Sequence, residues 1–204
     1  MAVIVLGRAA GKALIRDRRE RGADRHDEVW NGVYMMSPDP DNDHQSIGLY
    51  FSIACISATE KIVGRQVFHG CNVTDRSDHW SKNFRCPDDA VFLPGNPAVD
   101  MKTRWFGGPD FAVEVISPGD RSRKKFGFYA KVGVRELLLI GRKPWLLELY
   151  RLDDGELKLV GKSSPDSREA FVSQVLPISL RLLPGDPRPT IEVTQTEDAR
   201  QWLI

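Results

Sequence analysis

Apolar residues along the chain fall either into short runs typical of strands or into stretches with helical spacing. The run 110–116 is almost continuously apolar, and Ser117-Pro118 ends it. The pattern predicts a helix over 121–132, and a second short apolar run follows at 136–140. Strand, helix and strand in this order predict two parallel strands with the helix on one face of their sheet.

Two hairpins and a longer helix extend this pattern. Residues 28–36 surround Asn31-Gly32, the strongest short signal for a two-residue hairpin turn. Residues 43–62 have apolar side chains at helical spacing, and 146–160 predicts another hairpin. We therefore expect an α/β fold, with a mixed central β-sheet flanked by helices and an N-terminal helix and β-hairpin.

The same pattern divides the chain. Residues 1–24 predict a basic helical extension, because Ala, Arg and Lys dominate its later part and few residues there are large and apolar. Residues 25–185 predict one α/β domain, and 186–204 a Pro-containing C-terminal tail. A chain of 204 residues is long enough for one substantial core.

Composition narrows the choice of partners. The 29 Lys and Arg residues nearly balance the 28 Asp and Glu residues, which excludes attraction of the whole molecule to nucleic acid but not a local basic groove. No apolar run approaches the ~18–20 residues that span a bilayer, so we expect no membrane partner. Three cysteines make no disulfide framework, and we expect a cytoplasmic protein.

Two charged residues stand inside apolar patterns. Glu114 lies in the middle of the strand-like run 110–116, where a carboxylate is costly to bury unless it is paired or bound to a metal. Lys125 shares a helical stripe with the apolar and aromatic residues three, four and seven positions later. The two residues therefore form a structural ion pair or belong to a catalytic site, unless the lysine reaches solvent past its packed stem.

Asp88, at the start of another predicted strand, adds a third member to this set. If its strand lies beside that of Glu114, both carboxylates face one point. Carboxylate oxygens hold Mg²⁺, which polarises a phosphoryl oxygen and lowers the pKa of a bound water. A lysine can orient that water or stabilise the charge that develops on the phosphate. The set thus matches metal-assisted phosphodiester hydrolysis.

These residues stand in a specific order and spacing. The blocks are Pro87-Asp88, the run Gly108–Pro118 around Glu114, Lys125 with Tyr129, and upstream Glu28-Val29-Trp30-Asn31-Gly32 and Ser37-Pro38 with His44. Over residues 25–152 the chain resembles the Uma-type family of restriction-endonuclease-like proteins, within the PD-(D/E)XK nuclease superfamily.

The resemblance implies a restriction-endonuclease-like fold, a Mg²⁺ or Mn²⁺ cofactor and DNA as the substrate of an endonuclease. It implies Asp88 and Glu114 as metal ligands and Glu28 as an accessory carboxylate. Lys125 would be the superfamily lysine moved from the strand to the helix, because Ile116 holds the place two residues after Glu114. A homodimer is a further expectation, since nucleases that cut both strands commonly dimerise.

A second hypothesis is a catalytically silent module that binds nucleic acid or a protein partner. The basic residues Arg121, Arg123 and Lys124 lie beside the candidate site and are predicted to contact phosphates. A third reading keeps Glu114 and Lys125 as a purely structural pair.

Other candidates receive structural interpretations. Asp110 enters its strand too far from Glu114 to share a metal, and Asp89 points away from Asp88 into solvent. Glu136 opens the next strand and is expected to pair with Arg135 or Lys131. His44 caps or packs at a helix start or lies near the metal. A zinc reading lacks the spacing of structural sites; it would use His69, Cys71, His79 and Cys86.

Overall fold

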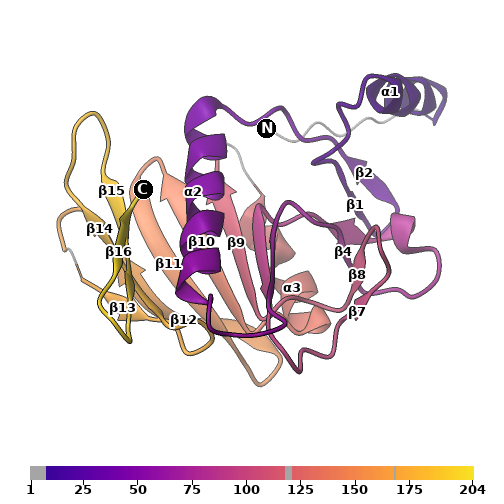
Figure 1. Cartoon of the computed structure of the whole chain (residues 1–204). Helices are drawn as coiled ribbons and strands as arrows, with labels where there is room; N and C mark the ends of the chain where they lie inside the picture. Colours follow the sequence, from indigo (N-terminus) through magenta and orange to yellow (C-terminus); the bar gives the residue numbers. More distant parts are fainter. Residues whose placement is uncertain (1–7, 118–120, 168) are drawn as a thin grey trace.

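The computed structural model describes residues 8–117, 121–167 and 169–204, and its strands form three sheets (Figure 1). The central sheet has the order β12-β11-β10-β9-β6-β3. Its strands are β3 (Gln66–His69), β6 (Asp89–Phe92), β9 (Phe111–Ile116), β10 (Glu136–Arg142), β11 (Trp145–Asp153) and β12 (Glu156–Ser163). Strands β9 and β10 run parallel and the other described pairs of this sheet are antiparallel, so the predicted mixed sheet is confirmed.

A helical segment connects the two parallel strands. It begins as the 3₁₀ turn η2 (Ser122–Lys125) and continues as α3 (Phe126–Val132), where one helix was predicted over 121–132. Gly133 ends α3 with a φ of +84°, a conformation that glycine adopts without a Cβ clash. Asp120, whose position just before 121–132 predicts a helix cap, lies outside the described residues.

The helices α2 (Asn42–Ala58) and α3 lie on opposite faces of the central sheet (Figure 1). Because side chains alternate along a strand, odd positions of β9, such as Val113, pack with α2. Even positions, such as Ala112, pack with α3. Glu114 shares the parity of Ala112 and therefore points to the α3 face.

A second sheet, with the order β2-β1-β5-β4-β8-β7, forms one wall of the site described below. It contains β1 (Glu28–Trp30), β2 (Val33–Met35), β4 (Val73–Thr74), β5 (Phe84–Arg85), β7 (Val99–Asp100) and β8 (Trp105–Phe106). The predicted hairpin turn is confirmed, with φ of +48° at Asn31 and +86° at Gly32. Trp105 stacks on Phe92 at a centroid distance of 3.9 Å and joins this sheet to β6.

The third sheet lies at the C-terminal end of the chain, in the order β13-β14-β15-β16. Its strands are β13 (Phe171–Val172), β14 (Ile178–Leu183), β15 (Thr190–Gln195) and β16 (Gln201–Leu203). Residues 186–204, which the prolines marked as a tail, thus hold two strands. Ile191 and Val193 belong to the core that contains α2, and their alternation with Thr190, Glu192 and Thr194 is a strand signal.

Helix α1 (Arg8–Glu20) lies beside the β1–β2 hairpin, at the opposite end of the molecule from the C-terminal sheet (Figure 1). None of the helices formed by the described ranges is long and apolar enough to cross a membrane.

Two interpretations of acidic residues need correction. Asp89 does lie on the face opposite to Asp88, but its predicted exposure is wrong. The carboxylate is fully buried between α2 and β3, where it accepts a hydrogen bond from Ser52 Oγ at 2.5 Å and lies 2.9 Å from His69 Nδ1. Glu136 is structural as predicted, but its cation is Arg151, at 2.7 Å on the neighbouring strand. Both errors arise because these partners come from distant segments of the chain.

Replacement of Glu136 by alanine tests how far this buried pair stabilises the junction of the central and C-terminal sheets. Glu136 is fully buried, and it also accepts hydrogen bonds from Ser173 Oγ and the Gln174 backbone. Loss of these contacts should lower the free energy of unfolding by about 2–4 kcal/mol, measured by urea denaturation. Glu156→Ala, an exposed acid of the same sheet, should change it by less than about 0.5 kcal/mol.

Candidate active site

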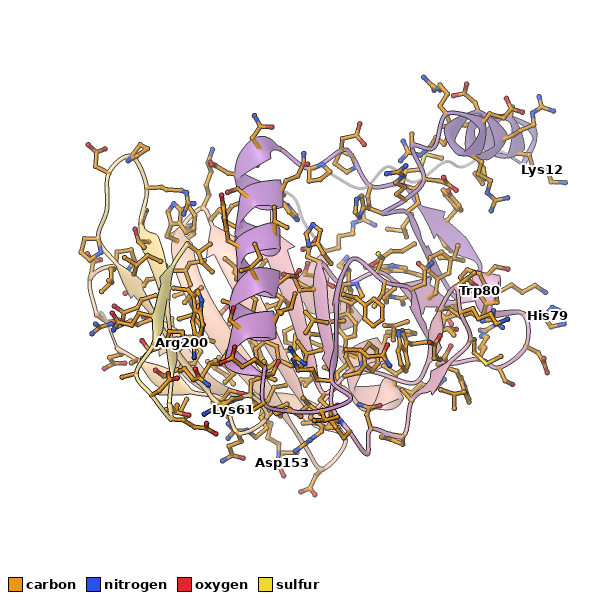
Figure 2. All side chains as sticks on the ribbon, in the orientation of Figure 1. Lys12, Lys61, His79, Trp80, Asp153 and Arg200 are labelled. Atoms are coloured by element: carbon orange, nitrogen blue, oxygen red, sulfur yellow. The ribbon has the colours of Figure 1, made fainter. Side chains whose placement is uncertain are left out.

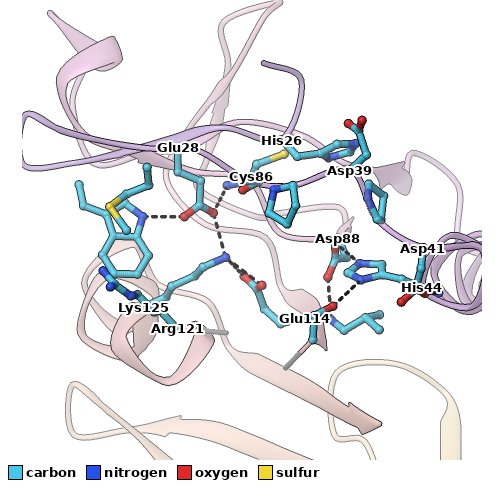
Figure 3. Close-up of a pocket in the computed structure, with 17 residues that line it drawn as sticks. His26, Glu28, Asp39, Asp41, His44, Cys86, Asp88, Glu114, Arg121 and Lys125 are labelled. Carbon is cyan, nitrogen blue, oxygen red and sulfur yellow. Dashed lines mark hydrogen bonds and ion pairs between the residues drawn. The ribbon is translucent and has the colours of Figure 1, made fainter. Parts of the chain in front are cut away.

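A pocket of about 290 Å³ opens between the β1–β2 hairpin, the start of α2 and the adjoining ends of β6 and β9 (Figure 3). Its lining includes the candidate residues Glu28, His44, Asp88, Glu114, Arg121 and Lys125. Glu28, His44, Asp88 and Glu114 come from segments far apart in the sequence, so only the fold brings them together.

Asp88 and Glu114 meet because β6 and β9 are antiparallel neighbours. The pairing of Asp89 with Val113 places Asp88 across from Glu114. The backbone of Asp88 donates to Val113 O at 3.0 Å, and its carboxylate accepts a hydrogen bond from Val115 N at 2.6 Å. The two strands therefore fix Asp88 through backbone contacts on both sides of Glu114.

Lys125 joins the two sheets through its ammonium group. Its Nζ atom lies 2.9 Å from both oxygens of Glu114 and 2.9 Å from Oε1 of Glu28 (Figure 3). The side chains of all three residues are about nine-tenths buried or more. The predicted proximity of Glu114 and Lys125 is thus present, and Glu28 shares the same cation.

Neutral donors hold the two glutamates in place. Trp30 Nε1 donates to Glu28 at 2.6 Å, and the backbone of Cys86 donates to it at 2.9 Å. The hydroxyl of Tyr129 donates to Glu114, and that of Ser122 lies 3.3 Å from it. Tyr129 stands one helical turn after Lys125, so the same stripe of the helix supplies both contacts.

His44, in the first turn of α2, lies against Asp88 at the other side of the pocket. Its Nε2 atom is 2.9 Å from Asp88 Oδ1 (Figure 3). Asp41 caps α2 by accepting from the His44 backbone at 2.9 Å. Arg142 donates to Asp41 at 2.7 Å and to Ser117 at 2.9 Å, which ties the helix start to the end of β9.

The pKa values of the charged groups in the site are shifted in different directions. Burial raises the pKa of Glu114, Lys125 opposes this, and the nearby Asp88 and Glu28 carboxylates raise it further. Burial also disfavours the charged form of Asp88, but the hydrogen bond and charge of His44 lower its pKa below the usual value. Burial likewise opposes the charge on Lys125, yet Glu114 and Glu28 keep its pKa above the ordinary range. Lys125 is therefore a permanent cation at neutral pH.

The donor set fits a divalent metal ion of the magnesium type. Asp88 and Glu114 offer two carboxylates to one pocket, and Mg²⁺ is commonly held by one or two carboxylates while several of its ligands remain water. No cluster of three or more His, Cys, Asp or Glu side chains suited to a metal ion occurs within residues 8–117, 121–167 and 169–204. Most ligands of an ion in this pocket would thus be water or substrate.

Other predicted residues lie around the pocket or away from it. Arg121 lines it, whereas Arg123 is turned toward β11, where it contacts Glu148 and donates to Tyr150 Oη at 2.5 Å. Lys124 is exposed. Asp110 lies at the far end of β9, buried and bonded to Leu93 N, Asn96 and Arg135, so its interpretation as a strand-entry residue holds.

Sequence reasoning missed several contacts of the site. It named Tyr129 beside Lys125 but gave it no contact with Glu114, and it left His44 as either a cap or a group near the metal. It did not identify the Trp30 indole as a donor to Glu28, although a strand places residues 28 and 30 on one face. Arg142 carried no usable signal, because its partner Asp41 lies 101 positions away in the chain.

A mixed sheet flanked by helices, with an Asp, a Glu and a Lys gathered at one pocket, agrees with the restriction-endonuclease-like fold that the resemblance implies. The family model for Uma2, described as "Putative restriction endonuclease", matches residues 16–184, and the chain belongs to this family. The predicted family and fold class are therefore confirmed. A search of curated proteins finds no match.

Among solved structures, the chain is similar to one described as a "putative nuclease belonging to DUF820" from Anabaena variabilis. The TM-score is 0.57 at 17% sequence identity, and the match covers 74% of this chain and 82% of the other. At this identity the likeness concerns the fold.

Replacement of Lys125 by methionine should destabilise the protein, because Glu28 and Glu114 would remain buried without their shared cation. We expect the free energy of unfolding to fall by about 3–5 kcal/mol, measured by urea denaturation. The added substitution Glu28→Gln should restore part of this loss. The matched control Lys124→Met removes an exposed neighbouring lysine and should change stability by less than about 0.5 kcal/mol. Equal effects at the two positions would contradict the shared-cation account.

Proposed function

We propose that this chain is a metal-dependent endonuclease of the PD-(D/E)XK type that hydrolyses phosphodiester bonds in DNA. The observation that carries the proposal is the convergence of Asp88, Glu114 and Lys125 at one pocket, from two strands and the helix that follows. Membership of a family described as "Putative restriction endonuclease" supports the same reaction class.

Asp88 and Glu114 would hold Mg²⁺ or Mn²⁺. When bound, the ion would polarise a phosphoryl oxygen and lower the pKa of its water. The protein's own contribution starts with preorganisation, since Val115 N and His44 fix Asp88 before any ligand arrives. Pre-fixed ligands avoid reorganisation during the reaction.

Lys125 is suited to stabilising negative charge rather than to accepting a proton. Glu114 and Glu28 raise its pKa against the effect of burial, so the amine is protonated at neutral pH while both glutamates face it, which favours an electrostatic role. A cation beside the scissile phosphate stabilises the charge that develops there. Glu28, an accessory carboxylate, would hold this ammonium in place through its 2.9 Å contact.

Phosphate contacts at the mouth of the pocket are assigned to three basic residues. Arg121 lines the pocket itself, and Lys124 is exposed close by. Arg123 would have to leave Glu148 to reach a phosphate, and its side chain is 54% exposed. These contacts are sequence-independent, so they would position the backbone of the substrate rather than read its bases.

A second candidate is a module that binds nucleic acid without cleaving it. One observation favours it: both oxygens of Glu114 lie 2.9 Å from Lys125 Nζ, and Tyr129 also donates to them. A carboxylate so fully engaged must exchange partners before it can bind a metal ion. Calorimetric titration of the protein with Mn²⁺ separates the enzyme from the binding module. Binding by the native protein that disappears in Glu114→Gln favours the enzyme.

The variants Asp88→Asn and Glu114→Gln test the enzyme proposal directly. Each keeps the size of the side chain but removes a negative charge that metal binding needs. We expect each to reduce Mg²⁺-dependent cleavage of plasmid and linear DNA by at least about 10²-fold, while circular dichroism remains that of the native protein.

Asp39→Asn is the matched control, because Asp39 is an exposed acid that lines the same pocket. It should retain nearly full cleavage. Metal-dependent cleavage that survives in both Asp88→Asn and Glu114→Gln would refute the proposed roles.

A further inference from the structure

A second groove lies between α1 and the β1–β2 hairpin, and the proposed reaction does not use it. It has a volume of about 480 Å³. We call it the basic groove, after its lining cations Lys12, Arg16, Arg19 and Lys82. Glu20 is the one acid among its lining residues in the described part of the chain, so these side chains carry a net charge of 4 − 1 = +3.

The cations of the basic groove are available for another partner. Arg16 lies 3.8 Å from Glu20 in a pair whose side chains are 76% and 69% exposed, and Arg19 is equally far from Asp24. Such long, exposed pairs contribute little free energy and exchange readily. Within the described ranges, neither Lys12 nor Lys82 forms an ion pair.

A buried ion pair fixes the shape of this groove. Asp27, whose side chain is 2% exposed, accepts from Arg18 Nε and Nη2, both at 2.7 Å. The same carboxylate accepts from Tyr34 Oη at 2.8 Å and from Ser37 N at 2.7 Å. Asp27 therefore clamps the basic helix to the hairpin. Since Arg18 serves as the anchor and Arg21 contacts Asp17, Arg16 and Arg19 are the arginines of the run 16–21 that face the groove.

The hairpin is a wall shared by the basic groove and the active-site pocket. Glu28 and Trp30 line the pocket, whereas Val29 lines the groove, as the alternation of side chains along β1 requires. A single phosphate can occupy one of these cavities. A chain of linked phosphates that crosses the hairpin would contact both.

We propose that the basic groove binds the phosphate backbone of a polynucleotide whose scissile bond lies in the active-site pocket. The proposal rests on the proposed function and narrows its substrate to strands long enough to cross the hairpin. An anionic membrane is the other polyanion to consider. Helix α1 has only Leu14 and Ile15 as large apolar side chains among residues 11–20, too few for an interfacial helix.

The test compares two triple variants of the full chain in binding to a fluorescein-labelled DNA duplex, with chelator present so that no hydrolysis occurs. The groove variant is Lys12→Gln/Arg16→Gln/Lys82→Gln. The control, Lys61→Gln/Lys158→Gln/Arg200→Gln, changes the net charge equally. Lys61 and Arg200 lie far from Lys12 on the molecule (Figure 2). Anisotropy titrations over a series of KCl concentrations give the slope of log K against log salt.

Loss of three phosphate contacts should weaken binding by about tenfold or more and reduce the magnitude of the slope by roughly 2–3. The control should keep the slope of the native protein. Equal losses in both variants, or no DNA binding by the native protein, would overturn the proposal. So would a groove variant that loses binding only to phosphatidylserine vesicles.

The same variants separate this proposal from the proposed function. Asp88→Asn should abolish cleavage but keep the native salt slope, because it removes no phosphate contact. Suppose that the native protein binds DNA with the predicted slope of log K against log salt but never cleaves it. This result would contradict the proposed nuclease function and still support the basic groove as a binding site.

Discussion

The ammonium group of Lys125, shared between Glu28 and Glu114, is the interaction on which the arrangement of the site depends. Its three members come from the hairpin, the central sheet and the connecting helix, which no stretch of local sequence could bring together. Burying either glutamate without a partner would cost folding free energy, and the one cation offsets this cost for both carboxylates. Loss of the ammonium would leave two buried carboxylates without a cation, at a high cost in folding free energy. The contact that assembles the charged pocket therefore also holds the second sheet against the central sheet.

Strand parity decides which acid goes to which side of the molecule. Asp88 and Asp89 are neighbours in sequence, yet one faces the pocket beside His44 and the other is buried under α2 beside His69. Each carboxylate has a histidine partner, but only one of the two pairs lies at the pocket. Fold similarity alone could not make this distinction, since similarity at 17% identity concerns the backbone.

Local signals in the sequence predicted much of this structure. The Asn31-Gly32 turn, the strand around Glu114 and the stripe containing Lys125 all depend on neighbouring residues, and they were found. The contacts of Asp27, Asp89 and Glu136 were not, because their partners lie on other helices and strands and no periodicity links them. The prolines of 186–204 led to the prediction of a tail where β15 and β16 lie. The alternation of apolar and polar residues in 190–194 is nevertheless a strand signal. The site was predictable where a charge interrupted an apolar pattern, and unpredictable where polar residues met across loops.

The length of the short β1–β2 hairpin sets which of its side chains face the active-site pocket and which face the basic groove. Each of its strands has three residues, with Glu28 and Trp30 on one side and Val29 on the other. Inserting or deleting one residue before the turn would reverse the facing of the whole strand. Valine would then meet the ammonium of Lys125, and a carboxylate would enter a groove lined by four cations. Variation among related chains should therefore preserve the number of residues 28–35 and the side chains of Glu28 and Trp30, and fall on the other positions of the hairpin.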